Sequence, residues 1–440
     1  MHYPDKENIF QIALLVVFGF FAVTGVLFLA FFRGQGTAAP ITSQVVVWGP
    51  PFYGNAFTQS LREAGDDNPV FKNITYVVKN PATLYGDLLE AIASGRSPDL
   101  VILNSTGVLS LRNKLFPIPF SALPKSVYEE TYIDGAKVFM LNDGIYAYPL
   151  LVDPLVLYWN KHLFANAAIP SAPRDWESFV QLVPKLSMIT DGANLTQSAV
   201  AFGEFDNVLH AKEIVSTLFM QLGYSIVAQR DRGFYSDLTE TKENARAESA
   251  LTFYTAFSSP VRRNYYSWNK TFDRSREAFA ANRVAMYGGF VSEERLLGEI
   301  NPNLNYGMAV WPQSSNSYFS VTYGNFHGVG VLRSSRNPQD AMIAANLLSG
   351  HQFTSILSKN SLLPPVRKSS LALENQTDPH HRVKVQSAII SKSWLEPAPK
   401  SSTERIFQTA INNVVAGSRS PSAAVQAMRA ELEALLRDYN

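Results

Sequence analysis

The 440-residue chain contains no cysteine, which excludes disulfide bonds, thiolate metal ligands, cysteine nucleophiles and lipid attachment through cysteine. Charge is also sparse. Charged residues make up 17% of the chain and the formal net charge is +1, whereas an average soluble protein has about 25% charged residues. No long basic run is present, although nucleic-acid binding usually needs a basic patch or stripe. The composition therefore predicts no nucleic-acid partner.

Long apolar runs are rare except for one near the start of the chain. Residues 9–32 include no charged side chain and would span about 36 Å as a helix, against a hydrocarbon core of about 30 Å. We predict a transmembrane helix here, after a short head (1–8) and before a flexible tether (33–43). The alternative is a cleaved signal peptide, but its apolar segment is typically about 7 to 15 residues. The flanking charges, Lys6 and Arg33, do not fix the orientation.

Alternating strand and helix patterns follow the tether. Apolar, strand-like runs occupy residues 45–49, 74–78 and 98–103, and helical patterns occupy residues 56–65 and 84–95 between them. This order predicts a parallel α/β sheet, in which ligands bind beyond the carboxyl ends of the strands. The loops at these ends are candidate binding loops, and they carry Trp48, Phe52, Tyr53, Asn104 and Ser105.

From about Tyr146 the pattern changes to helices mixed with short extended pieces. The clearest helical stretches are residues 211–223, 245–259 and 276–287. A glycine-punctuated strand then precedes a helix that Pro338 opens, and Ser420 is placed to cap a final amphipathic helix. These patterns predict a second lobe.

Four sequence blocks resemble one known family. The first is YAYPLLVDPLVLYWNKHLFANAAIPSAPRDWESF, the second is REAFAANRVAMYGGF followed by NYGMAVWP, the third is NFHGVGVLRSSRNPQDAMIAANLLSG, and the fourth is AINNVVAGSRSPSAAVQAMRAEL. In this order and spacing they resemble the extracellular solute-binding proteins of ABC importers (family 1), within the sugar-binding branch that includes maltose-binding protein. Together the blocks sample nearly all of the chain beyond the tether.

The resemblance implies a class II periplasmic-binding-protein-like α/β fold, in which two α/β lobes joined by a multi-strand hinge close around a ligand. It also implies that both lobes are discontinuous in sequence. Lobe 1 would comprise residues 44–150 and 326–374, and lobe 2 residues 151–325 and 375–440. The apolar VGVL run agrees with this order, because it fits a buried strand that rejoins the first sheet.

Asp153 interrupts the apolar run at the start of the first block. The matching family position lies just past the first crossing between the lobes, and it carries an acidic residue that accepts hydrogen bonds from sugar hydroxyls. A carboxylate suits this role because it has two acceptor oxygens and makes stronger hydrogen bonds than a neutral acceptor. The alternative is a hinge carboxylate held by backbone amides or by an arginine.

The resemblance implies further ligand contacts in the lobes and the hinge. Trp48, Phe52 and Tyr53 follow the first strand, although Trp48 also fits a core position. Phe290 or Tyr287 would replace the family's stacking tryptophan, which AMYGGFVS lacks, and this departure argues against maltodextrin specificity. The remaining candidates, for which caps or hinge contacts are the alternative roles, are Asn104, Glu204, Asp206, Asn207, Tyr323, Asn325 and Glu404.

The sequence predicts binding rather than catalysis. Asp153 with Glu204 or Asp206 has the composition of a glycosidase pair, but such carboxylates are common in sugar-binding clefts, and no HExxH, GxSxG or GxxxxGK[ST] motif is present. We expect no metal and no cofactor. The alternative function is a membrane-tethered sensory or scaffolding protein with the same two-lobe fold.

We therefore expect a monomeric, single-pass protein of the cell membrane with its solute-binding domain on the extracytoplasmic side. It would bind a carbohydrate, either an oligosaccharide or a related polyol, between its lobes and deliver it to ABC permease subunits. A ligand that contacts both lobes would shift the population toward a closed state.

Overall fold

A computed structural model describes residues 41–52, 55–190, 194–230, 233–239, 241–242, 245–315, 320–374 and 377–440. The predicted head, the predicted transmembrane helix and most of the tether lie outside these ranges. Within the described ranges, no helix combines the length and the apolar character needed to cross a membrane.

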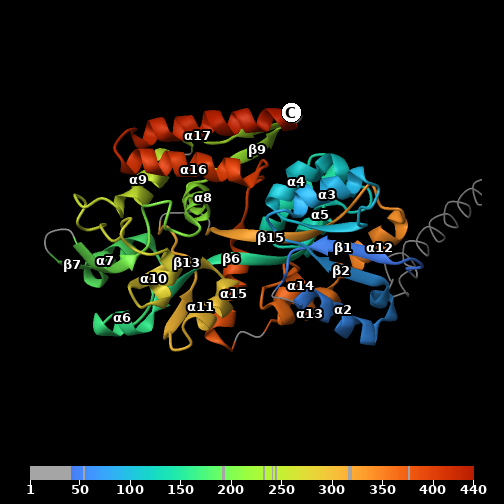
Figure 1. Ribbon diagram of the computed structural model, residues 1–440, viewed down its shortest axis with the longest axis horizontal. Helices are drawn as coiled ribbons and strands as arrows, with labels where there is room; N and C mark the ends of the chain where they lie inside the picture. Colours follow the sequence, from blue (N-terminus) through green and yellow to red (C-terminus); the bar gives the residue numbers. More distant parts are fainter. Residues whose placement is uncertain are drawn as a thin grey trace, which may run out of the picture.

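One sheet of ten strands runs through the molecule and connects its two halves (Figure 1). The strand order is β2-β1-β3-β15-β6-β13-β8-β7, with β14 paired to β6 and the short strand β16 (Ser391–Lys392) paired to β15. Helices cover the sheet in both halves, which we call the first lobe and the second lobe.

The first lobe holds the strands that the alternating pattern predicts. β1 (Val45–Gly49) pairs in parallel with β2 (Ile74–Val78) and β3 (Leu100–Leu103), which confirms the parallel sheet. The lobe also contains α2 (Ala56–Asp67), α3 (Leu84–Ala93), α4 (Ser105–Leu111), α5 (Lys125–Thr131), α12 (Pro338–Leu348), α13 (His351–Ser361) and α14 (Lys368–Leu371).

The second lobe is built on the other end of the sheet, with β7 (Met188–Thr190), β8 (Asn194–Val200), β13 (Val284–Phe290) and β14 (Tyr306–Ala309). Its aromatic residues form much of the core, and Trp268 and Trp311 are fully buried. The helices that pack around these strands are α6 (Lys161–Asn166), α7 (Trp176–Leu186), α8 (Ala211–Gln221), α9 (Glu248–Ala256), α10 (Ser275–Ala280), α11 (Glu293–Ile300), α15 (Pro379–Ile389), α16 (Lys400–Val415) and α17 (Pro421–Leu436).

Two long strands carry the sheet from one lobe to the other. β15 (Thr322–Val331) pairs antiparallel with β3 through residues 328–331 and with β6 (Tyr148–Asn160) through residues 324–329. Beyond Pro154, β6 pairs instead with β13 and β14 of the second lobe. Almost every residue of β6 is buried, which explains its apolar sequence. The boundaries given above for the two lobes stay a prediction.

The predicted helix over residues 276–287 is wrong in its second half. α10 ends at Ala280, Asn282 has a left-handed backbone (φ 59°), and Val284–Phe290 form strand β13. This strand is buried between β6 and β8, so pairing with distant strands decides its conformation. The helix predicted over residues 245–259 begins only at Glu248.

Candidate functional site

The hinge strands place three polar side chains on one face of the sheet. Asp153 in β6 pairs directly with Asn325 in β15, and His327 lies two residues further along β15. Directly paired residues in antiparallel strands have neighbouring side chains, and residues two apart in a strand point to the same face. All three line a single cavity, and we call them the hinge floor.

Asp153 is only 6% exposed. Its Oδ1 accepts a hydrogen bond from the backbone N–H of Ser292 at 2.9 Å. Burial raises the pKa of Asp153 to about 7, although hydrogen bonding to Ser292 opposes this rise. Apart from Ser292, no residue that the structure describes donates a hydrogen bond to this carboxylate, which leaves acceptor capacity for a ligand.

Asn325 and His327 are half-buried, and their side chains make no hydrogen bond to any described residue. The His327 ring lies edge-on to Phe52, with 5.0 Å between ring centroids and 80° between ring planes. Burial lowers the pKa of His327 to about 4, so the imidazole is neutral at physiological pH. It then offers one donor and one acceptor nitrogen to a ligand.

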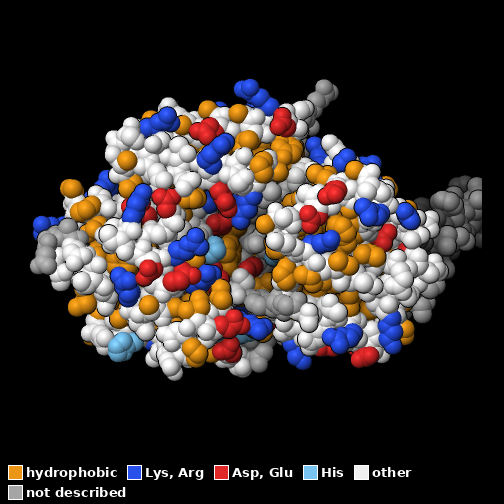
Figure 2. All heavy atoms as spheres, viewed as in Figure 1, with side chains coloured by type: hydrophobic (Ala, Val, Ile, Leu, Met, Phe, Trp, Pro, Cys, Tyr) orange, Lys and Arg blue, Asp and Glu red, His pale blue; other side chains and the backbone are white. Residues whose placement is uncertain are grey.

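The hinge floor lies at the base of a cavity of about 700 Å³, within the range of small-molecule sites. Figure 2 shows the molecular surface hollowed between the two lobes. The first-lobe wall is mainly apolar and includes Pro50, Pro51, Phe52, Pro81, Leu84 and Tyr85. The second-lobe wall is mainly polar or charged and includes Ser292, Arg295, Leu296, Glu299 and Lys400.

Both cations of the second-lobe wall have carboxylate neighbours. Arg295 Nε donates to Glu299 Oε1 at 2.9 Å. Lys400 Nζ lies 3.7 Å from Glu404 and 3.9 Å from Glu213. The wall therefore offers hydrogen-bonding groups without a large excess of either charge, which suits a neutral polar ligand better than an ion.

Glu293 fixes the loop that holds Asp153. This buried carboxylate accepts hydrogen bonds from the Phe290 backbone N–H (3.0 Å) and the Tyr287 hydroxyl (2.6 Å), and it contacts His210 Nε2 at 2.5 Å. Burial alone would raise the pKa of Glu293, but His210 and the hydrogen bonds lower it below its usual value. A charged Glu293 thus positions the preceding residue, Ser292, whose backbone N–H donates to Asp153.

Four of the predicted ligand residues line the cavity, namely Phe52, Asn104, Asp153 and Asn325. Asn104 also caps α4, because its Oδ1 accepts the Gly107 N–H at 3.1 Å. Tyr53 lies outside the described residues. The cavity lining does not include Trp48, Glu204, Asp206, Phe290, Tyr323 or Glu404.

Three of these outlying residues have packing roles. Trp48 packs against the core, and Lys79 Nζ lies 3.7 Å from its ring centroid. Phe290 and Tyr323 are 8% and 4% exposed, and their rings pack against each other with 6.2 Å between centroids. Tyr287, the other candidate for stacking, is also fully buried.

Glu204 and Asp206 have partners within the second lobe. Asp206 Oδ1 accepts from Gln408 at 2.8 Å and Oδ2 lies 3.4 Å from Lys270 Nζ. Lys270 Nζ also lies 3.8 Å from Glu204, while Asn207 bonds the loop at Asn269 and Phe272. Across the described part of the chain, no group of three or more His, Asp or Glu side chains is placed to hold a metal ion.

The sequence prediction missed His327, Tyr85, Arg295 and Lys400, all of which line the cavity. Strand alternation could have predicted His327, because it lies two residues after the predicted Asn325. Arg295 could not have been predicted in this way, since α11 begins shortly after β13, and the first part of β13 was predicted as a helix. No local pattern marks Lys400, whose position depends on how α16 packs.

The fold and the cavity define a two-lobe, periplasmic-binding-protein-like α/β protein. A family model described as bacterial extracellular solute-binding protein matches residues 59–383. The chain therefore belongs to this family, and the predicted family is confirmed. A curated relative from Brucella abortus (strain 2308) is 21% identical over 354 residues, which cover 79% of this chain and 81% of the relative.

Solved structures of similar shape support the same fold class. A cyclo/maltodextrin-binding protein complexed with maltotetraose has a TM-score of 0.72 at 16% identity, with 91% of this chain and 98% of that chain covered. A solute-binding protein from Thermotoga lettingae TMO bound with α-D-tagatose has a TM-score of 0.65 at 17% identity, with 90% and 100% covered. The protein CpMnBP1 with mannobiose bound has a TM-score of 0.63 at 20% identity, with 89% and 100% covered.

Proposed function

We propose that this protein is the membrane-anchored, extracytoplasmic solute-binding component of an ABC importer, and that it binds a carbohydrate between its lobes. The observation that carries the proposal is the hinge floor. Asp153, Asn325 and His327 meet at the base of the cavity with hydrogen-bonding capacity that the described protein groups leave unused. Buried polar groups normally find partners, and a ligand would supply them here.

The two walls suit the two kinds of surface on a sugar. Its C–H faces would pack on Phe52, Tyr85 and the neighbouring prolines, while its hydroxyls would bond to the hinge floor and the second-lobe wall. The sugars in the similar solved structures support an oligosaccharide or a related polyol as the ligand class. The paired charges of Arg295 and Lys400 favour a neutral sugar.

Binding is coupled to closure because residues of both lobes line the cavity, and the hinge strands β6 and β15 join these lobes. A ligand that bonds both walls stabilises the closed arrangement more than the open one, and this shifts the population toward closure. The closed protein then delivers its ligand to a permease. An apolar helix at residues 9–32 would keep the protein at the membrane, close to that permease.

A thermal-shift screen of the full chain in mild detergent tests the proposal. The compounds are mono- and oligosaccharides, polyols, amino acids and small phosphates. A ligand at a hundred times its dissociation constant should stabilise the folded state by about 2.7 kcal/mol. Stabilisation by sugars alone, without turnover, is the expected result. If the folded protein responds to none of these compounds, the proposal fails and the sensory or scaffolding alternative gains support.

The membrane location has its own test. Cells expressing the full chain and a variant that lacks residues 1–40 are fractionated, and intact cells or spheroplasts are treated with protease. We expect the full chain in the membrane fraction with its lobes open to external protease, and the shortened variant in the soluble fraction. A full chain that remains soluble would contradict the anchor.

A further inference from the structure

Glu396 is a buried carboxylate that contacts both lobes. It is 2% exposed and lies on the segment from β16 to α16. In Figure 1 this segment runs between the two lobes before α16 begins. Its Oε1 accepts hydrogen bonds from Lys212 and Thr403, and its Oε2 accepts one from Thr106 at 3.1 Å. We call Glu396 and these three partners the Glu396 cluster.

The partners of Glu396 belong to different lobes. Lys212 lies in α8 and Thr403 in α16, both in the second lobe, whereas Thr106 lies in α4 of the first lobe. Lys212 is 2% exposed. Burial alone would lower the pKa of Lys212, but the charges of Glu396 and Glu213 outweigh burial and raise it. Lys212 is therefore charged and holds Glu396 on the second lobe. Of the three hydrogen bonds in the Glu396 cluster, lobe separation would break the one from Thr106.

The Glu396 cluster is connected to the ligand cavity on both sides. On the first lobe, Asn104 lines the cavity and caps the helix that carries Thr106. On the second lobe, Lys400 lines the cavity and lies 3.9 Å from Glu213, which lies 3.7 Å from Lys212. Closure around a ligand and formation of the Thr106–Glu396 bond would therefore bring together the same two elements, the start of α4 and the start of α16.

We propose that the Thr106–Glu396 hydrogen bond is a closure latch that regulates the cavity by favouring the closed arrangement of the lobes before ligand binds. The buried carboxylate gains a donor only when the lobes meet, and a hydrogen bond to a charged group is stronger than one between neutral groups. The regulatory part of this inference rests on the proposed ligand-binding function. The effect on lobe arrangement does not.

Thr106→Val tests the latch, and Thr403→Val is its matched control. Each substitution removes one hydroxyl that donates to Glu396 and keeps a β-branched side chain of similar size. Only the first bond joins the two lobes. Thr106→Ser keeps the hydroxyl and should behave as the unsubstituted protein, which separates loss of the hydrogen bond from disturbance of α4.

The absence of cysteine makes distance measurements between the lobes straightforward. Glu90→Cys in α3 and Asn303→Cys in the second lobe replace exposed residues, and they allow spin labelling without background. Distances are measured in the full chain without ligand. Thr106→Val should lower the ratio of closed to open molecules by about tenfold or more, since a net hydrogen bond to a charged group is worth about that factor. Thr403→Val should leave the distance distribution unchanged while reducing the melting temperature.

Two results would overturn the latch. One is an unchanged distance distribution in folded Thr106→Val, and the other is an equal change in Thr403→Val. Because these distances are recorded without ligand, they test the latch even if no sugar binds. If a sugar binds to the closed arrangement, its dissociation constant should rise in Thr106→Val by the same factor by which the fraction of closed molecules falls. The dissociation constant should not change in Thr403→Val.

Discussion

Asp153 in the hinge and Asp206 in the second lobe differ in what surrounds their oxygens. Asp153 is 6% exposed and bonds only to Ser292 among the described residues. The Asp206 side chain is 44% exposed and contacts both Gln408 and Lys270. Burial raises the pKa of Asp153 to about 7, whereas the hydrogen bond from Gln408 and the charge of Lys270 lower the pKa of Asp206.

This difference separates two uses of a carboxylate in one molecule. Asp206 forms its bonds in the unliganded protein and has water as a further partner. Asp153 is held out of water with acceptor capacity unused, which costs free energy unless a ligand or a proton satisfies it. A shared acidic character is therefore a weaker guide to a binding role than the number of partners that the folded chain already supplies.

The largest expected effect is on stability at Asp153. The folded protein holds the Asp153 proton to a higher pH than the unfolded chain does, so this residue lowers the free energy of unfolding as pH rises from about 4 to about 7. A pKa rise from 3.8 to about 7 corresponds to about 4 kcal/mol. Asp153→Asn, which keeps an oxygen for the Ser292 N–H, should therefore become the more stable protein as pH increases. Urea unfolding of both proteins at pH 4 to 8 measures this difference.

Asp206→Asn is the control for this pH series. Because the Asp206 side chain is 44% exposed, water screens its bonds to Gln408 and Lys270, and its replacement should change the free energy of unfolding by less than about 1 kcal/mol at any pH in the series. Parallel pH profiles for Asp153→Asn and the unsubstituted protein would contradict the environment assigned to Asp153.

The next effect is on the pH dependence of ligand binding. If the ionised Asp153 carboxylate accepts from ligand hydroxyls, affinity falls as pH drops below the pKa of about 7. Binding at pH 6 should be about tenfold weaker than at pH 8. Calorimetric titration across this range measures the change, and Asp153→Asn should lose the dependence. An equally steep dependence in the variant would assign it to another group.

A smaller effect is expected at His327. The neutral imidazole would contribute a single uncharged hydrogen bond, worth about 1 kcal/mol or about fivefold in affinity. His327→Phe keeps the aromatic contact with Phe52 and removes the hydrogen-bonding nitrogens. Its dissociation constant for sugar should rise about fivefold. An unchanged dissociation constant would remove His327 from the ligand contacts.

The sequence predicts the strands and helices of the first lobe well, because each of them has a clear local pattern of apolar residues. It fails at β13, where VAMYGGF follows a helix and becomes a strand by pairing with β6 and β8. The resemblance to solute-binding proteins predicts Asp153 and Asn325, which lie opposite each other in the hinge.

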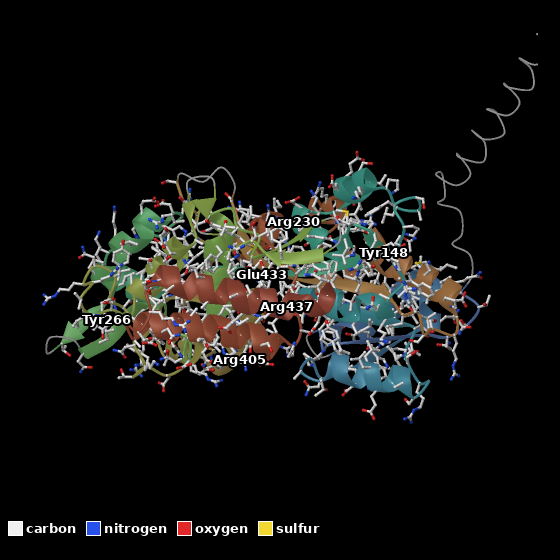
Figure 3. The ribbon with its side chains drawn as sticks, turned by 90° about the horizontal axis from the view of Figure 1, so that it is seen from above. Tyr148, Arg230, Tyr266, Arg405, Glu433 and Arg437 are labelled. Atoms are coloured by element: carbon white, nitrogen blue, oxygen red, sulfur yellow. The ribbon has the colours of Figure 1, made fainter. Side chains whose placement is uncertain are left out.

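The remaining part of the site depends on three-dimensional packing. Arg295 and Lys400 reach the same wall from helices about a hundred residues apart in sequence, α11 and α16. Figure 3 shows the closely packed side chains along α16 and α17, with Arg405, Glu433 and Arg437 on the same side of the second lobe. No local pattern indicates which residues of such helices turn toward the cavity and which stay on the outer surface.

The most direct test of the central claim is to measure the affinity of one sugar for the unsubstituted protein, Asp153→Ala and Asp206→Ala. A hydrogen bond to a charged group is worth about 1.5 to 3 kcal/mol, so Asp153→Ala should bind about 10- to 100-fold more weakly. Asp206→Ala should bind as the unsubstituted protein does. Equal affinity in Asp153→Ala, or an equal loss in Asp206→Ala, would contradict the assignment of the hinge floor as the ligand-binding site.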